Sequence, residues 1–138
     1  MNTGYVLAFD FGLRHIGVAV GQSITSTANP LKTLEARNGR PDWAEIDEMI
    51  RQWQPAFLLV GLPINMDDSE SEMSGRARQF GAALARRSAR EVQMVDERLT
   101  SYASRQADSG RSHEMAAVLI AETWLAEPDR GTTPTPPA

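Results

Sequence analysis

Acidic side chains follow three apolar stretches of this sequence, where a folded sheet would bring them together. These acids are Asp10, Asp67, Asp68, Asp96 and Glu97. In an open α/β sheet, ligands bind beyond the carboxyl ends of the strands, so acids that end strands can converge on one site. Converging carboxylates repel one another and stay ionised only with a cation between them, and such oxygen ligands suit Mg²⁺ or Mn²⁺. The pattern therefore predicts a divalent-metal site of the kind that can cleave phosphodiesters.

Each acid taken alone also has a purely structural explanation. An aspartate between a strand and a glycine-bearing turn, such as Asp10, often hydrogen-bonds to its own backbone. Asp96 and Glu97 could cap a following helix, and residues 67–68 could lie in a solvated loop. The elements around the acids, and their order along the chain, decide between these interpretations.

Apolar periodicity predicts a five-stranded mixed sheet flanked by three helices. Strands are expected at residues 5–9, 16–20, 31–36, 56–63 and 91–95, and helices at residues 43–54, 72–88 and 113–127. The resulting order, β-β-β-α-β-α-β-α, is that of an α/β fold with an antiparallel part and right-handed crossovers. In this fold, residues 10 and 96–97 end strands, as the metal-site interpretation requires.

Polar residues mark the expected helix starts. Asp42 with Glu45, and Ser69 with Glu72, have the spacing of a capping box. Ser112 is the expected N-cap of the last helix. The tryptophans fall on apolar helix faces, so we expect them to pack in the core rather than to stack on bases; they are Trp43, Trp53 and Trp124.

The composition is typical of a folded chain without a membrane anchor. Its 138 residues are 41% hydrophobic and 23% charged, and they include no cysteine, which excludes disulfides and thiolate chemistry. The formal charge of −4 argues against a broadly basic nucleic-acid-binding surface. No basic leader and no apolar run of about 20 residues is present, so we expect a cytoplasmic protein. Residues 1–127 are the expected domain, and residues 128–138 the expected disordered Pro/Thr-rich tail.

Several polar residues near the acids are candidates for contacts to nucleic acid. Arg14 and Arg98 lie beside the acids and could bind phosphates through forked hydrogen bonds, or could instead neutralise the acids. Asn65 is a candidate polar contact. Arg76 begins a run of arginines on the second helix, which could bind a nucleic-acid backbone or could simply be its solvated face.

Two glycines are expected to have structural roles beside Asp10. Gly12 follows it within the predicted turn, and Gly17 is the second residue of the next predicted strand. Both are expected to shape the turn and to permit close approach of the backbone.

Four stretches of the sequence, in this order, resemble the YqgF family, also called the Holliday-junction-resolvase-like or pre-16S ribosomal RNA nuclease family. They are "LAFDFGLRHIGVAVG", "VGLPINMDDSESEMSGRARQFG", "VDERLTS" and "MAAVLIAETWL". The stretches cover nearly all of the chain up to Glu127, and "VGLPINMD" followed by "DERLT" is fairly specific. The resemblance implies an RNase H-like fold and metal-dependent cleavage of a structured nucleic acid with Mg²⁺ or Mn²⁺.

The resemblance also implies which residues act. Asp10 matches the first catalytic aspartate of the family, and Glu97 matches the acid of its "DER" motif. The third acid of the family stands just before "AA" at the start of the last helix, where this sequence has His113. The connection at residues 100–112 is also shorter than the family pattern, which often carries a longer basic stretch there.

The histidine at the third acidic position leaves several possibilities open. His113 could be a metal ligand, since neutral imidazole binds divalent metals and prefers Mn²⁺ over Mg²⁺. The adjacent Glu114 could substitute, although one helical step rotates a side chain by about 100°. Catalysis could also be weakened or lost, with His113 merely starting the helix.

The resemblance makes processing of the 5′ end of pre-16S rRNA the leading function, with the small ribosomal subunit as a possible partner. Resolution of four-way DNA junctions is the nearest alternative, because the same acids could perform it. A catalytically weak RNA-binding assembly factor is a third reading, favoured by His113. The stretch "DFGLRHIGVAVG" also resembles the phosphate loop of the actin and sugar-kinase superfamily, whose members generally close two such domains on a nucleotide.

Overall fold

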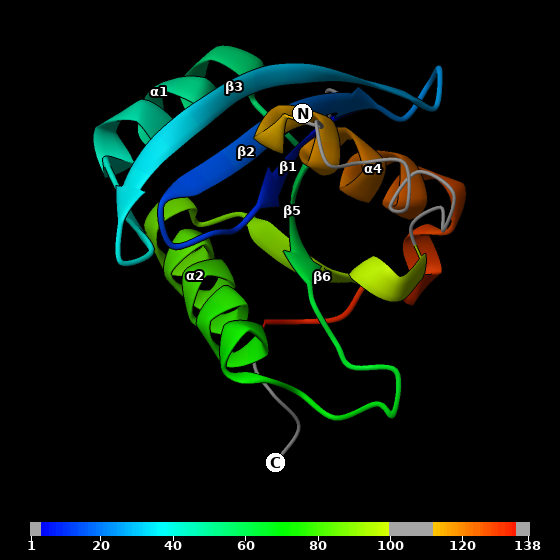
Figure 1. Ribbon diagram of the computed structural model, residues 1–138. Helices are drawn as coiled ribbons and strands as arrows, with labels where there is room; N and C mark the ends of the chain where they lie inside the picture. The colour runs from blue at the N-terminus through cyan, green and yellow to red at the C-terminus, as the bar shows by residue number, and fades with distance from the viewer. Residues whose placement is uncertain (1–3, 100–111, 135–138) are drawn as a thin grey trace.

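The amino-terminal half of the sheet is a meander of antiparallel strands in the computed structural model, which describes residues 4–99 and 112–134 (Figure 1). Each strand pairs with the next through a short connection, as the alternating apolar pattern predicts. The strands are β1 (Tyr5–Asp10), β2 (His15–Gln22), β3 (Thr27–Arg37) and β4 (Arg40–Pro41). This part of the fold confirms the predicted β-β-β order and adds one short strand.

The second half of the sheet is parallel and depends on helical crossovers. Helix α1 (Trp43–Trp53) leads from the meander to β5 (Phe57–Leu62), which pairs with β1. Helix α2 (Glu72–Ser88) then leads to β6 (Glu91–Asp96), which pairs with β5. The strand order is β4-β3-β2-β1-β5-β6, so the sheet of residues 4–99 and 112–134 has six strands, and the predicted number of five is wrong.

The differences from the predicted strands have local causes. The strand predicted from residue 31 begins at Thr27, because Pro30 sits where the β2–β3 register shifts and a proline can be accommodated. The additional strand, β4, is two residues long and follows a tight turn of Asn38 and Gly39. Both turn residues have positive φ, 50° and 80°, as a two-residue hairpin turn requires.

The helices begin at polar caps, two of which are the predicted ones. The side chain of Asp42 accepts a hydrogen bond from the backbone N–H of Ala44 at 3.0 Å. Ser112 caps the last helix, α4 (His113–Ala126). The predicted cap Ser69 is wrong: Ser71 caps α2, and Ser74 completes its capping box.

The cap of α2 is displaced because Ser69 is used by the preceding loop. Its backbone N–H and hydroxyl both donate to Asp67, and its hydroxyl also accepts from Asn65 Nδ2 at 2.9 Å. These bonds close the loop after β5 on itself. The helix itself begins at Glu72, as predicted, but its cap is Ser71, two residues after Ser69.

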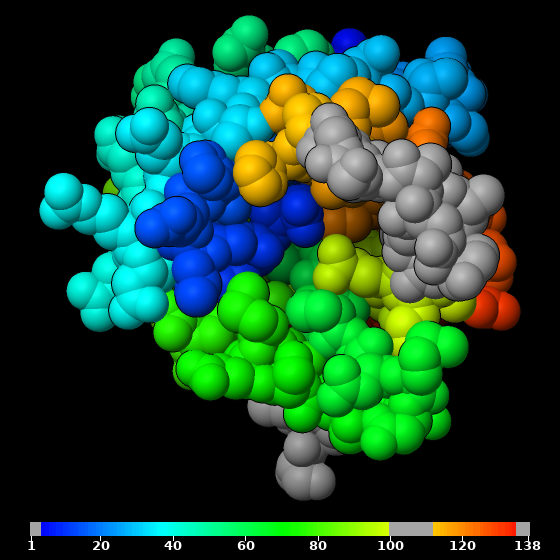
Figure 2. Space-filling model, viewed as in Figure 1, coloured from blue at the N-terminus to red at the C-terminus, as the bar shows by residue number. Residues whose placement is uncertain are grey.

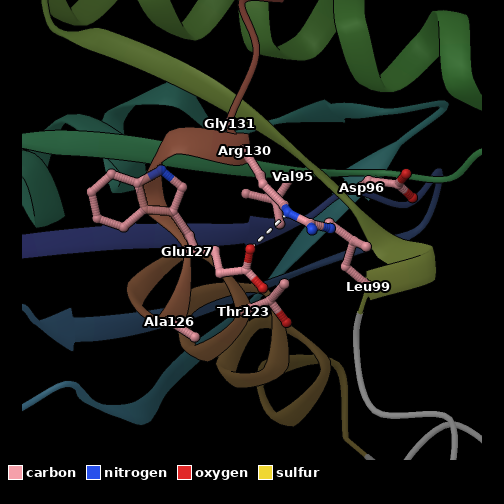
Figure 3. A pocket seen from close by; sticks show the side chains of 9 residues that line it. Val95, Asp96, Leu99, Thr123, Ala126, Glu127, Arg130 and Gly131 are labelled. Carbon is pink, nitrogen blue, oxygen red and sulfur yellow. Dashed lines mark ion pairs between the residues drawn. The ribbon is translucent and has the colours of Figure 1, made fainter.

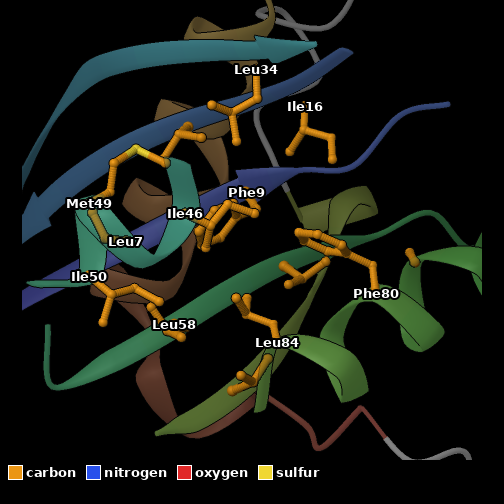
Figure 4. Packing of buried hydrophobic residues seen from close by; sticks show 14 of the residues in the cluster. Leu7, Phe9, Ile16, Leu34, Ile46, Met49, Ile50, Leu58, Phe80 and Leu84 are labelled. Carbon is orange, nitrogen blue, oxygen red and sulfur yellow. The ribbon is translucent and has the colours of Figure 1, made fainter. Parts of the chain in front are cut away.

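Alternate residues of each strand face two different cores, and this determines where Asp10 points. Leu7 and Phe9 pack with α1 and α2 in the larger core, which Figure 4 shows. Val6 and Ala8 face the opposite side and pack under α4. Because side chains alternate along a strand, Asp10 lies on the α4 face of the sheet. Trp124 is buried there, while Trp43 and Trp53 pack partly against the larger core, as predicted.

The segment after α4 returns to the edge of the sheet. A 3-10 helix, Pro128–Arg130, leads to Thr132, which pairs with Met94 of β6. The first residues of the segment predicted as a tail therefore make backbone contacts, while residues 135–138 lie outside the described part. The domain boundary at residue 127 stays a prediction. In the described part of the chain, no helix is long and apolar enough to cross a membrane.

Candidate active site

Asp10 lies in a row of residues that runs across the sheet under the start of α4. Gly17 of β2 is directly opposite Asp10, and Thr33 of β3 is opposite Gly17. On the other side, the parallel register pairs Phe9 with Val60, so Gly61 is the neighbour of Asp10 on β5. Asp10 is therefore flanked on both sides by residues without a side chain.

Gly17 allows the beginning of α4 to rest on the sheet beside Asp10. A Cβ atom at Gly17 would lie only 2.0 Å from the carbonyl oxygen of His113 and 2.8 Å from the nitrogen of Glu114. Any side chain here would push the helix away. The predicted close approach of the backbone is thus observed, although Gly17 lies within β2 rather than in a turn.

Gly61 makes room on the other side of Asp10 for Glu97. A Cβ atom at Gly61 would lie 3.2 Å from both Cγ and Cδ of Glu97 and 2.5 Å from Cδ1 of Ile120. Glu97 begins a 3-10 helix (Glu97–Leu99) that directly follows β6, and its side chain returns over the end of β5. The structure therefore brings Glu97 to the strand that borders Asp10.

Four segments of the chain surround a hollow in the molecular surface. Figure 2 shows it between the dark blue end of β1, the orange start of α4, the yellow-green residues after β6 and the green residues after β5. Asp10 ends β1, Glu97 directly follows β6, and His113 begins α4. These are the three positions at which the sequence predicted metal ligands.

Burial sets the charge state of Asp10. Loss of hydration raises the pKa of its carboxyl from 3.8 to about 6, and the nearby His113 opposes this rise. In the described part of the chain, no hydrogen bond to the Asp10 carboxylate offsets the lost hydration. The ionised form is therefore held at a cost, which a cation beside it would reduce.

The donors around Asp10 have the chemistry of a hard divalent-cation site. Asp10 and Glu97 offer carboxylate oxygens, which Mg²⁺ and Mn²⁺ prefer, and His113 offers an imidazole nitrogen. Within residues 4–99 and 112–134, however, no three His, Asp or Glu side chains are close enough together to hold one ion. The two carboxylates fit a metal by type and burial, and the third ligand stays a prediction.

Glu114 points to a different strand. Its carboxylate accepts a hydrogen bond from the hydroxyl of Thr33 on β3, and this bond lowers the pKa of Glu114 below its usual value. Since β3 is two strands away from β1, the hydrogen bond fixes the start of α4 rather than serving Asp10. The predicted catalytic role of Glu114 remains an untested prediction.

His15, at the start of β2, also lies against the site. Its ring stacks on that of His113, with 4.7 Å between centroids and 17° between planes. His15 begins β2, just before the row that contains Gly17. The contact joins the start of β2 to the start of α4, and no local sequence pattern could have indicated it.

Arg98 is engaged by acids rather than exposed to a ligand. It donates to both carboxylate oxygens of Asp96, with Nη2 to Oδ2 at 2.8 Å, and to Asp68 Oδ1 at 2.7 Å. Its Nη1 also donates to the backbone oxygen of Asn65 at 3.1 Å. These bonds raise the pKa of Arg98 and tie the loop after β5 to the end of β6. Arg98 thus pairs with acids in the structure, and its predicted contact to phosphate stays a prediction.

The other predicted contact residues are spread around the site. Arg14 is exposed in the β1–β2 connection, and Gly12 makes the turn there, since a Cβ atom would lie 2.5 Å from the oxygen of His15. Arg76 lies on the opposite face of the sheet, where it donates to the backbone oxygen of Asn38 at 2.5 Å. The proposed phosphate contacts of Arg14 and Arg76 stay predictions.

A separate small pocket on the α4 side does not contain the predicted ligands. It has a volume of about 130 Å³ and lies between β6, the end of α4 and the Pro128–Arg130 helix (Figure 3). An ion pair of Arg130 with Glu127, at 2.7 Å, crosses it. Asp10, Glu97 and His113 do not line this pocket, so it is not the candidate site.

Three comparisons with known proteins bear on this site. The family model of RuvX, described as a Holliday junction resolvase, matches residues 4–127. A protein of Nitrosococcus oceani with the provisional name pre-16S rRNA nuclease is 51% identical over 131 residues, which are 88% of this chain and 86% of that protein. A protein of Marinobacter nauticus with the same name is 52% identical over 132 residues, with coverages of 88% and 92%.

The fold itself is similar to that of a solved structure of RuvC. The structure of Thermus thermophilus RuvC in complex with a Holliday junction substrate matches with a TM-score of 0.61 and 16% identity, covering 93% of this chain and 98% of that one. At this identity the likeness concerns the fold alone. It confirms the predicted RNase H-like α/β architecture.

Proposed function

The chain belongs to the RuvX family, also called YqgF, and from this premise we propose that it is a metal-dependent endonuclease that processes the 5′ end of pre-16S rRNA. The family and the names of the relatives make it a nuclease, a hydrolase of phosphodiester bonds. The proposal concerns its metal, its residues and its substrate. We further propose that it acts in the cytoplasm, with the small ribosomal subunit or its precursor as partner.

One observation supports the chemistry most strongly. The glycines on both sides of Asp10 allow Glu97 and the start of α4 to close over the same end of the sheet. Between these elements lies the Asp10 carboxylate, whose pKa is raised by loss of hydration. Such a carboxylate favours a site for a cation and an anionic substrate.

The chain's own residues have distinct roles in this proposal. Asp10 and Glu97 would hold a divalent ion, Mg²⁺ or Mn²⁺, and position it over the end of β1. When bound, such an ion supplies Lewis-acid stabilisation of the phosphodiester and a more acidic water. His113 would complete the ligand set from the start of α4, with its ring orientation supported by the stacked ring of His15.

The identity of the third ligand makes a testable difference to metal preference. An imidazole nitrogen favours Mn²⁺ over Mg²⁺ more than a carboxylate oxygen does. Replacing His113→Asp should therefore shift the ratio of Mn²⁺-supported to Mg²⁺-supported activity toward Mg²⁺. An unchanged ratio would show that His113 does not ligate the metal.

The names of the relatives favour ribosomal RNA over a DNA junction as the substrate. The decisive experiment compares cleavage of a pre-16S 5′-leader RNA with that of a four-way DNA junction, each with Mg²⁺ or Mn²⁺. We expect metal-dependent cutting of the leader at a higher rate, and none by the Asp10→Asn variant. Preferential cutting of the junction would establish the resolvase alternative.

The absence of cutting would indicate a function other than cleavage. Tight binding of the leader by folded protein, without turnover in either metal, would contradict the nuclease proposal and identify a binding or assembly factor. The phosphate-loop alternative predicts ATP binding instead. Cleavage that is unaffected by ATP would count against that reading.

A further inference from the structure

The hairpin that joins β3 and β4 presents two arginines to each other at its tip. Arg37 and Arg40 are directly opposite in the antiparallel register, and both are exposed. Like charges directly opposite each other on a β-ladder are destabilising. In the described part of the chain neither arginine takes part in an ion pair, so the fold contains no partner that explains the arrangement. An anionic ligand would explain it.

The hairpin is held rigidly, as a binding element requires. A Cβ atom at Gly39 would lie 2.8 Å from the Phe11 ring and 3.1 Å from Arg76 Nη2, so the turn packs closely against both. Arg76 also donates through Nη2 to the backbone oxygen and, at 3.1 Å, to the side-chain oxygen of Asn38. The tip is thus attached to α2, and little chain entropy is lost when it binds.

A groove with an aromatic floor lies beside this tip. Its volume is about 550 Å³, within the range of small-molecule sites, and it is open to solvent. The rings of Trp43 and Phe80 are stacked at 5.6 Å between centroids, and Phe11 packs on Phe80 at 5.3 Å. The described residues that line the groove include Arg40 and Arg76 and no acid, which suits an anion with an apolar part.

The groove begins one residue from Asp10. Phe11 directly follows Asp10, but its side chain belongs to the α1–α2 face while Asp10 belongs to the α4 face. A strand of nucleic acid that crosses the end of β1 at Asp10 would therefore next reach the groove and the hairpin tip. Figure 2 shows the bright blue residues that follow β1 between the cyan hairpin and the central hollow.

We propose that the groove and the hairpin tip form a subsite for an unpaired nucleotide next to the scissile phosphate. The base lies over the aromatic floor, and Arg37 and Arg40 contact the backbone phosphates beside it. A base within a duplex could not bind in this way, because its faces are already stacked on neighbouring bases. The subsite rests on the proposed function for its place next to the cut, but its binding can be measured without cleavage.

Two variants separate the phosphate contacts from the base contact. Arg37→Gln with Arg40→Gln removes the paired charges at the tip, and neither residue contributes to a core. Ala83→Leu places a larger side chain into the groove and leaves the arginines unchanged. The matched control is Arg51→Gln with Arg130→Gln, which also removes two exposed positive charges. Each of these arginines pairs with a glutamate three residues before it, and such exposed pairs contribute little to stability.

The experiment measures the affinity for a fluorescent single-stranded RNA oligonucleotide by anisotropy, in EDTA and over a range of salt concentrations. The same measurement is then repeated with the complementary strand annealed to the oligonucleotide. The tip variant should bind the single strand about 10-fold more weakly, and the slope of log affinity against log salt should fall by about 1.4, since each lost phosphate contact contributes about 0.7. Ala83→Leu should weaken binding several-fold at unchanged slope. The control should bind as the wild type does.

Three outcomes would overturn the inference. If the Arg37/Arg40 variant binds RNA as tightly as the wild type, these arginines do not contact phosphates. If the Arg51/Arg130 control loses as much affinity as this variant, the loss reflects the general loss of positive charge rather than a specific contact. Equal weakening of single-stranded and annealed RNA by Ala83→Leu would exclude a base-selective groove. The protein could also bind RNA through the hairpin but cleave no substrate. This result would support the subsite and contradict the proposed nuclease activity.

Discussion

Asp10 should destabilise the metal-free protein, and its removal should make the fold more stable. Burial raises the pKa of Asp10 from 3.8 to about 6, and one pKa unit corresponds to about 1.4 kcal/mol, so the ionised carboxylate costs about 3 kcal/mol. Asparagine has no charge to bury but must still lose hydration. We therefore expect Asp10→Asn to raise the free energy of unfolding by about 1–3 kcal/mol at pH 7.5, or several degrees in Tm.

The effect must depend on pH in one direction. Between about pH 4 and pH 6 the folded state holds more protons at Asp10 than the unfolded state, so the stability of the wild type falls as pH rises through this window. Below about pH 4 both states are protonated and the cost disappears. The advantage of the variant should therefore be small at pH 4, grow up to about pH 6, and stay constant above it.

Urea unfolding in EDTA at pH 4, 5, 6 and 7.5 measures this difference directly. Glu122→Gln is the control, because it removes one negative charge from the exposed surface of α4. Adding Mn²⁺ at pH 7.5 should stabilise the wild type and leave Asp10→Asn unchanged. A variant that is less stable than the wild type at pH 7.5, or a difference that does not vary with pH, would refute the reasoning.

Three further changes test how the site is positioned. Gly17→Ala should reduce activity strongly and destabilise the fold by about 1–3 kcal/mol, because its methyl group would overlap the carbonyl of His113; circular-dichroism melts and cleavage rates check this. Ser74→Ala should cost about 1–3 kcal/mol in chemical unfolding, because its buried hydroxyl donates to the carbonyl of Pro63, and wild-type stability would contradict it. Arg98→Ala should lower the Tm slightly through loss of its bonds to acids, whereas weaker substrate binding at unchanged Tm would indicate a phosphate contact instead.

Most elements could be predicted because their signals are local. The alternation in β1 and β2 and the helical spacing in α1, α2 and α4 depend on neighbouring residues alone. The same alternation placed Asp10 and Glu97 at strand ends. The errors occurred where tertiary contacts decide: the loop bonds of Ser69 moved a helix cap to Ser71, and a register shift admitted Pro30 into a strand.

The geometry of the site was less accessible from the sequence. Gly17 and Gly61 matter because α4 and Glu97 pack over them, and these partners are far away along the chain. The stacking of His15 on His113 and the capture of Glu114 by Thr33 are likewise long-range contacts. The sequence indicated which groups could do chemistry, whereas their separations follow only from the folded chain.

Single-turnover cleavage of the pre-16S 5′-leader RNA tests the central claim most directly. The comparison is between the wild type, Asp10→Asn, Glu97→Gln and the surface control Glu122→Gln, each in Mg²⁺ and in Mn²⁺, with folding verified by circular dichroism. The account predicts metal-dependent cutting by the wild type and the control, and a loss of at least about 100-fold in both site variants. Undiminished cutting by folded Asp10→Asn and Glu97→Gln would contradict it.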